Sequence, residues 1–170
     1  VRMRTNPLHG HELPLGADGT RPAAGGAGQL RILAPPGTYT VKLTIGGRDY
    51  TQALTVRKDP HSAGSEADIA AQTTVLSDIR NHMNTAVDAI NQLEYVRAQV
   101  QSIMRTVPEG ELRRAAAELE GRLTDAEMKL IELRVTGTGQ DGVRFGAKLL
   151  QKFGYLANGI ASSDYRPTDQ

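Results

Sequence analysis

A glycine-rich segment, Gly137-Thr138-Gly139-Gln140-Asp141-Gly142, matches the pattern G-x-G-x-x-G that holds a pyrophosphate in dinucleotide-binding proteins. The pattern works only between a strand and a helix, because the phosphate must meet the N-terminus of that helix. Here the preceding residues have a helical heptad pattern, and neither a strand nor an acidic ribose ligand follows. We therefore interpret the segment as a loop between two helices, with Asp141 as a helix cap, and expect no cofactor.

His9, His11 and Glu12 form the one local cluster of residue types that bind metal ions. A zinc site needs three or four ligands, and the other histidines, His61 and His82, lie far away in the sequence. A pair of histidines in a loop is usually solvated. We expect no metal, and these three residues are the candidates for a site if one exists.

The sequence contains no Ser-x-x-Lys, Gly-x-Ser-x-Gly or His-Glu-x-x-His pattern, so no common nucleophile or metalloprotease motif is present. Carboxylates are plentiful in the segment after residue 108, beside several arginines and lysines. We expect most of them on the solvated outer face of a helix, in local ion pairs of small energy. We predict no catalytic residue and no enzyme activity for this chain by itself. The carboxylates are Glu109, Glu111, Glu118, Glu120, Glu127 and Glu132.

One long amphipathic helix, from Ser65 to about Val107, is expected to organise the chain. Its apolar residues follow the alternating three- and four-residue steps of a helix that packs along one seam. At 1.5 Å per residue such a helix is about 60 Å long, so it cannot bury this stripe alone. The predicted interaction seam consists of Ile69, Leu76, Ile79, Met83, Ile90, Leu93, Arg97, Val100 and Met104.

Arg97 and Gln72 are the polar residues at the two skipped steps of this seam. We expect Arg97 either to fix the register against a carboxylate of a neighbouring helix or to mark where the seam opens toward the β part. Both are structural roles.

Two further helices are expected downstream, at 109–135 and 144–161. The first has a regular seam that includes Leu112, Leu119 and Leu133, and its short connection predicts an antiparallel neighbour of the long helix. The second has a weaker pattern. Together they predict an antiparallel three-helix bundle over 61–170, with part of the long helix left for a missing fourth helix or for a partner.

Residues 1–60 are expected to form a β domain with a Gly/Pro-rich loop at 6–29. Alternation around the Gly46-Gly47 turn predicts a β-hairpin with one buried face. An immunoglobulin-like sandwich takes about 100 residues, so this one would be partial and completed by another chain or by upstream sequence. The predicted fold class is therefore α+β, a partial antiparallel immunoglobulin-like sandwich followed by the helical bundle.

Composition excludes several functions. The chain has 170 residues, 39% of them hydrophobic and 23% charged, and a formal net charge of +1, which favours neither nucleic acid nor an acidic membrane. No apolar run approaches the roughly 18 residues of a membrane-spanning helix, so we expect no membrane insertion. Cys is absent, which excludes disulfides. Because the chain begins at Val1 and shows no signal peptide, we expect it to be a processed or excised piece of a longer protein.

Several segments resemble one protein family. Residues 34–60 run Ala-Pro-Pro-Gly-Thr-Tyr-Thr-Val-Lys-Leu-Thr-Ile-Gly-Gly-Arg-Asp-Tyr-Thr-Gln-Ala-Leu-Thr-Val-Arg-Lys-Asp-Pro. Together with 65–69, 139–145, 148–156 and the tail Ser-Ser-Asp-Tyr-Arg-Pro-Thr-Asp-Gln at 162–170, they resemble the C-terminal region of bacterial sortilin-type (BNR-repeat) β-propeller proteins, often described as glycosyl hydrolases. The resemblance implies an exported protein, periplasmic or extracellular, whose upstream propeller holds any active site.

The leading hypothesis is a non-catalytic C-terminal accessory or assembly module of such a protein. Its partner would be its own upstream propeller or another copy of the chain, as a homo-oligomer. One alternative is a lobe of a glycoside or peptide hydrolase whose active site lies in the missing propeller. Another is a coiled-coil-type protein-binding module, which would expose its seam as a large apolar patch.

Overall fold

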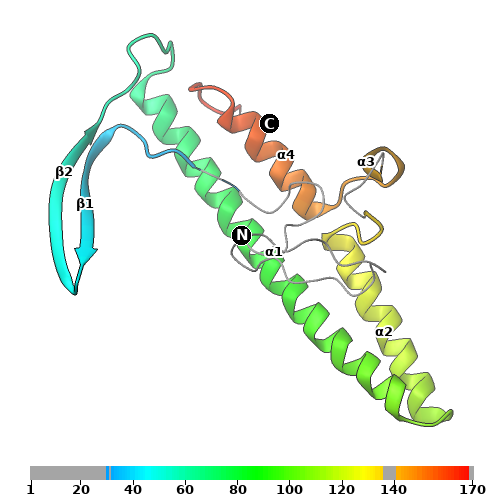
Figure 1. Ribbon diagram of the computed structural model, residues 1–170. Coiled ribbons are helices and arrows are strands. Elements are labelled where there is room, and N and C mark those ends of the chain that lie inside the picture. The colour runs from blue at the N-terminus through cyan, green and yellow to red at the C-terminus, as the bar shows by residue number, and fades with distance from the viewer. Residues whose placement is uncertain (1–29, 31, 136–140, 169–170) are drawn as a thin grey trace. The chain divides into compact units, whose positions relative to one another are not determined.

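The computed structural model describes residue 30 and residues 32–135 and 141–168. The order of elements is β1 (Gly37–Ile45), β2 (Arg48–Val56), α1 (Glu66–Thr106), α2 (Glu111–Leu130), α3 (Asp141–Arg144) and α4 (Leu149–Ala161) (Figure 1). The prediction of an α+β chain with one very long helix is confirmed. The immunoglobulin-like sandwich and the three-helix bundle stay predictions.

Contacts divide the chain into two units. Among the described residues, one unit contains 30, 79–135 and 141–158, and the other contains 32–78 and 159–168. Helices α1 and α4 each contribute residues to both units. This division does not coincide with the domain boundary predicted at residue 60, and that boundary stays a prediction.

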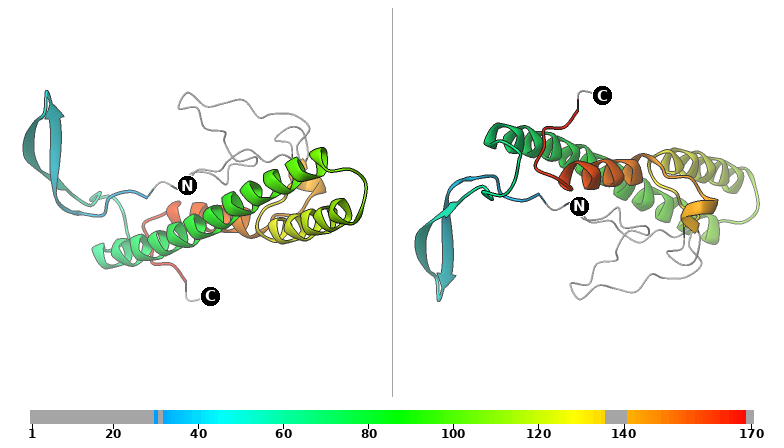
Figure 2. Two further views of the ribbon diagram at one scale, coloured as in Figure 1. Left: turned by 90° about the horizontal axis from the view of Figure 1, so that it is seen from below. Right: turned by 90° about the horizontal axis from the view of Figure 1, so that it is seen from above.

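The β-hairpin forms as expected. Strands β1 and β2 pair antiparallel in an open two-stranded sheet, with Ile45 opposite Arg48 and Gly37 opposite Val56 (Figure 2). The turn needs positive φ at both central residues, and Gly46 (56°) and Gly47 (78°) supply it without strain. The hairpin could therefore be predicted because the two glycines fit the turn and the flanking residues alternate between apolar and polar.

The prediction that one face of the hairpin is buried is wrong. Five apolar side chains on that face are between 48% and 61% exposed. The physical reason is that the described part of the chain places no second layer over them, since the sheet has two strands only. These side chains are Val41, Leu43, Ile45, Tyr50 and Leu54.

Helix α1 begins with a reciprocal cap at Ser65, the residue at which the sequence predicted the long helix to start. The backbone N–H of Asp68 donates to Ser65 Oγ at 3.1 Å. In return, the backbone N–H and the hydroxyl of Ser65 donate to Asp68 Oδ2 at 3.0 and 2.6 Å. This is a capping box with Asp in the place of Glu. The side-chain and backbone hydrogen bonds from Ser65 lower the pKa of the Asp68 carboxyl.

The second and third helices are shorter than predicted. Helix α2 ends at Leu130, because Ile131 has an extended backbone (φ −140°, ψ 149°). The carboxylate of Glu132 then accepts hydrogen bonds from the backbone N–H of Arg134 at 3.1 Å and from its guanidinium at 2.7 and 2.8 Å, which stabilises a turn instead of a further helical turn. The helix expected at 144–161 is present as α4 from Leu149, preceded by the separate four-residue α3.

Gln72, the other polar residue of the α1 seam, holds the end of α4. Its amide Nε2 donates to the carbonyl of Ile160 at 2.7 Å and to that of Ser163. The carbonyls in the last turn of a helix have no partner within the helix, so this amide satisfies groups that would otherwise cost free energy. Gln72 is buried, which makes its contribution larger than that of a surface residue.

Gln72→Leu is expected to lower the free energy of unfolding by about 1–2 kcal/mol, because the carbonyls lose their donor and cannot all reach water. Residues 159–168 should then exchange their backbone amide hydrogens faster, as measured by mass spectrometry. Gln92→Leu, at an exposed position of the same helix, is the control and should change stability by less than about 0.5 kcal/mol. Equal effects of the two substitutions would contradict the role assigned to Gln72.

Candidate functional site

A buried ion cluster joins α1 to α2 around Arg97. Its Nη1 donates to Glu127 Oε2 at 2.6 Å, and its Nη2 and Nε donate to Glu120 Oε1 at 3.0 and 3.2 Å. The side chains of Arg97 and Glu127 are fully buried, and that of Glu120 is 19% exposed. Gln101 Nε2 donates to the same oxygen of Glu120 at 3.0 Å. The guanidinium is therefore bound from two sides by carboxylates one α2 heptad apart.

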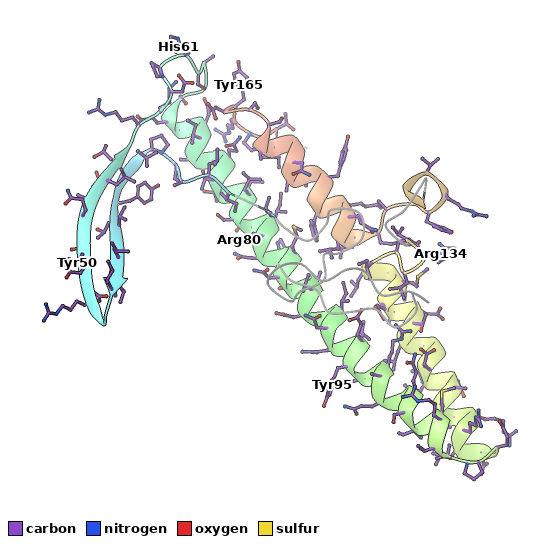
Figure 3. All side chains as sticks on the ribbon, viewed as in Figure 1. Tyr50, His61, Arg80, Tyr95, Arg134 and Tyr165 are labelled. Atoms are coloured by element: carbon purple, nitrogen blue, oxygen red, sulfur yellow. The ribbon has the colours of Figure 1, made fainter. Side chains whose placement is uncertain are left out.

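Helix packing explains why these groups meet. Helix α2 lies alongside the C-terminal part of α1 in all three views, as expected for antiparallel neighbours with a short connection (Figures 1 and 2). Glu120 and Glu127 are seven residues apart, so they project from the same side of α2. In contrast, Tyr95 projects from the side of α1 away from α2 and is 60% exposed (Figure 3).

The prediction that most carboxylates of the segment after residue 108 lie on a solvated outer face is wrong for three of them. Glu127 and Glu132 are buried, and Glu120 is partly buried. The reason is that each meets a guanidinium, Arg97 for the first and third and Arg134 for Glu132, which offsets the cost of removing the carboxylate from water. Glu109, Glu111 and Glu118 are exposed as expected.

The surroundings of Glu120 and Glu127 shift the pKa values of these two carboxyl groups in opposite directions. Burial raises the pKa of Glu127 above its usual value, although Arg97 acts against this rise. Burial also acts to raise the pKa of Glu120, but hydrogen bonds from Gln101 and Arg97 outweigh it, so the pKa of Glu120 is lowered. Such separation is typical of functional sites, but structural ion networks produce it too.

Glu94 is the member of this cluster that we did not single out from the sequence. It lies on α1 three residues before Arg97 and is buried. Its side chain acts to lower the pKa of the Glu127 carboxyl, against the effect of burial. The sequence did contain a signal: a charged residue inside an apolar seam requires buried counter-charges, and Glu94 and Arg97 share one side of α1.

The predicted interaction seam of α1 faces the interior of this chain. Arg97 contacts carboxylates of the neighbouring helix α2, as its first predicted role requires. That these contacts fix the register of the two helices stays a prediction. The seam residues are not exposed for a partner in this structure. Leu76, Ile79, Met83, Ile90, Arg97 and Val100 are buried, and Ile69, Leu93 and Met104 are half-buried.

The other candidates from the sequence fall partly outside the described residues. His9, His11 and Glu12 all do, as do Gly137 and Gly139 of the glycine-rich motif. Gly142 lies in α3, exposed to solvent. Within the described ranges, no three or more His, Asp or Glu side chains are arranged to hold a metal ion. No helix in the described part is both long and apolar enough to cross a membrane.

A small pocket of about 160 Å³ lies in the unit formed by 32–78 and 159–168. It is lined by the two ends of the hairpin, the first turns of α1 and residues after α4, among them Pro35, Lys58, Thr73 and Asp164. The amide of Gln72 is on its wall and is already bound to two carbonyls. The Lys58 ammonium donates to the carbonyls of Asp59 and Ser62. The polar groups of the wall thus serve the fold.

The apolar hairpin face is the most exposed candidate surface. We use this name for the aligned side chains of one side of the β1–β2 sheet, in which Tyr39 lies opposite Leu54 and Leu43 opposite Tyr50. The other side of the sheet is polar, with threonines and a Lys42–Asp49 ion pair of 2.7 Å. The face consists of Tyr39, Val41, Leu43, Ile45, Tyr50, Leu54 and Val56; Arg48 and Gln52 lie on the same side, opposite Ile45 and Val41.

No protein-family model matches the chain, and neither a curated protein nor a solved structure matches it significantly. The resemblance to sortilin-type β-propeller proteins therefore rests on the sequence segments quoted above and stays a hypothesis.

Proposed function

We propose that this chain is a non-catalytic accessory module that docks through its apolar hairpin face onto a second β layer. The observation that carries the proposal is the contrast between the two sides of the hairpin. One side presents seven apolar residues together with Arg48 and Gln52, and five of the seven are between 48% and 61% exposed; the other side is mostly polar. A two-stranded sheet is marginal in water, and a face of this kind is typical of one half of a sandwich.

The size of the face favours a partner in the same polypeptide over another copy of the chain. Two nine-residue strands cover about 30 Å by 10 Å, or roughly 300 Å². A symmetric pair of such faces would bury about 600 Å² in total, well below the roughly 1,200 Å² of a stable interface. A covalently linked partner needs less area, because linkage supplies a high effective concentration.

The helices would be the scaffold of this module. Within the unit formed by 79–158, α1 pairs with α2 through the Arg97 ion cluster, and His82 of α1 stacks on Phe153 of α4 with ring centroids 6.1 Å apart. These contacts support an antiparallel three-helix bundle of α1, α2 and α4. Such a bundle needs no ligand or cofactor. Because its seam is buried, it leaves less exposed apolar surface through which a coiled-coil-type module could bind a partner.

The resemblance supplies the proposed context. We assign the chain to the C-terminal region of an exported, periplasmic or extracellular β-propeller protein, where the missing β layer would be immunoglobulin-like strands or the propeller upstream. Any glycoside or peptide hydrolase activity would belong to that propeller. The hydrolase-lobe alternative has no support from the described residues, since the histidines that it needs lie outside them.

Leu43→Lys in the complete source protein tests docking. It should lower the melting temperature of the complete protein by several degrees, because a charge would be buried in the sandwich. In the 170-residue chain alone the same change should cost little, since Leu43 is 55% exposed there. Thr40→Lys, on the polar face of the same strand, is the matched control and should be neutral in both. Equal effects of Leu43→Lys in the two proteins would overturn the proposal.

A further inference from the structure

One side of the α1–α2 pair is apolar and exposed. On α1, Val96 directly precedes Arg97, and on α2, Leu119 directly precedes Glu120, to which Arg97 is bound. A step of one residue turns a helix by about 100°, and in an antiparallel pair the same turn leads to the same side of both helices. Residues seven positions away share that side. We use the name apolar helical face for the resulting set, whose members are between 39% and 62% exposed: Val96, Ile103, Leu112 and Leu119.

The exposed surface of α1 beside this face carries no charge. Between Asp88 and Arg105, the charged residues of α1 are Glu94 and Arg97, and both are buried. A partner helix can therefore lie against this part of α1 without burying an unpaired charge. Such a depletion of charged residues is typical of the core of a protein interface.

A row of exposed charges on α2 is complementary to itself. Its members are seven, four and seven residues apart, so they lie along one side of the helix: Glu111, Glu118, Arg122 and Lys129. In the described part of the chain none of the four forms an ion pair. If α2 lies antiparallel to α2 of a second copy and the two cross at residue 120, Glu111 faces Lys129 and Glu118 faces Arg122. In a parallel pair each charge would face its like, so the charges favour the antiparallel one.

The area of this side of the α1–α2 pair suits a symmetric dimer. Helix α2 has 20 residues, which is about 30 Å, and two adjacent helices are about 20 Å wide. Two copies face to face would bury roughly 1,200 Å² in total, which is the lower limit of a stable interface. The apolar hairpin face offers only about half of this area.

We propose that two copies of the chain pair through their apolar helical faces and form a four-helix bundle from two α1–α2 pairs. Helix α1 lies antiparallel to α1 of the second copy, and α2 lies antiparallel to α2, so the same surface serves both copies. The charged rows of the two α2 helices form the rim. This interface is separate from the apolar hairpin face and does not depend on the docking proposal.

Analytical ultracentrifugation of the 170-residue chain gives the first test, and we expect twice the mass of one chain. Leu119→Lys should weaken dimerisation by about 100-fold or more, because two ammonium groups would be buried. The helical circular dichroism should stay unchanged, since Leu119 is 41% exposed in the single chain. Ala117→Lys, at an exposed position of α2 outside the face, and Leu43→Lys, on the apolar hairpin face, should both remain dimers. A monomeric wild-type chain, or unchanged dimerisation of Leu119→Lys, would overturn the proposal.

Exchange of charges between copies gives the second test. Glu118→Arg and Arg122→Glu should each weaken the homodimer, because like charges then face each other across the interface. In a mixture of these two variants every facing pair is opposite in charge, so native mass spectrometry should show heterodimers above their statistical share. A mixture of Asp78→Arg and Arg80→Asp has the same net charges at exposed positions far from the face and should show no preference. A statistical distribution in the first mixture would rule out the antiparallel contact of the two α2 helices.

Discussion

Replacing Arg97 by methionine is expected to destabilise the chain by about 3–5 kcal/mol, a large part of the total stability of a small protein. Methionine fills a similar volume but removes the cation to which Glu127 and Glu120 are bound at 2.6 and 3.0 Å. The carboxyl of Glu127 is fully buried, so water cannot take the place of the guanidinium. The remaining buried charge is what makes the substitution costly.

The loss should become smaller in acid, because protonated carboxyl groups need no counter-ion. Urea unfolding at pH 7 and pH 4.5 measures both effects. Arg113→Met is the matched control: its ion pair with Glu109, 2.9 Å long, lies at the surface with side chains 39% and 83% exposed. That change should cost less than about 0.5 kcal/mol. Equal losses for the two arginines would show that the buried cluster has no special role.

Gly64→Ala is the second large effect. A Cβ at this position would lie 2.0 Å from the carbonyl oxygen of Asp164 and 2.8 Å from its carbonyl carbon, which are backbone atoms with little freedom to move. The loop before α1 and the segment after α4 would have to separate. We expect a loss of about 3 kcal/mol, at the upper end of the range for overpacking, and faster amide exchange in 159–168.

Gly121→Ala is the control for the loss of glycine itself. Nothing lies within 4 Å of a Cβ at Gly121, which is exposed in the interior of α2. Alanine is the better helix former, so this variant should gain about 0.5–1 kcal/mol. Thermal unfolding of the two variants side by side gives the comparison. A neutral Gly64→Ala would mean that the close contact with Asp164 is absent in solution.

Local periodicity predicted most of the secondary structure. The heptad steps of α1 and the alternation around Gly46-Gly47 depend only on neighbouring residues, so the long helix, its Ser65 cap and the hairpin could be inferred. The end of α2 could not, because an apolar pattern continues through Leu133 while Ile131 is already extended. The Glu132–Arg134 contact stabilises a turn after the end of this helix, and the heptad pattern of apolar residues gives no information about that contact.

The buried ion cluster was harder to predict because the side of α2 that carries its charges looks solvated. Glu120 and Glu127 alternate with Ala116, Leu123 and Leu130 in the same three- and four-residue steps as the seam. Arg97 in the seam of α1 was the sign that such carboxylates had to be inside. The exposure of the hairpin face was not predictable either, since alternation shows which residues share a face but not whether another element covers that face.

Hydrogen exchange at residues 37–56 tests the docking proposal most directly. It is measured by mass spectrometry on the protein isolated from its source and on the 170-residue chain, under the same conditions. We predict that the hairpin amides are strongly protected in the source protein, where a β layer covers the apolar hairpin face, and exchange rapidly in the chain alone. Equally rapid exchange in both, or a source protein no longer than this chain, would contradict the proposal.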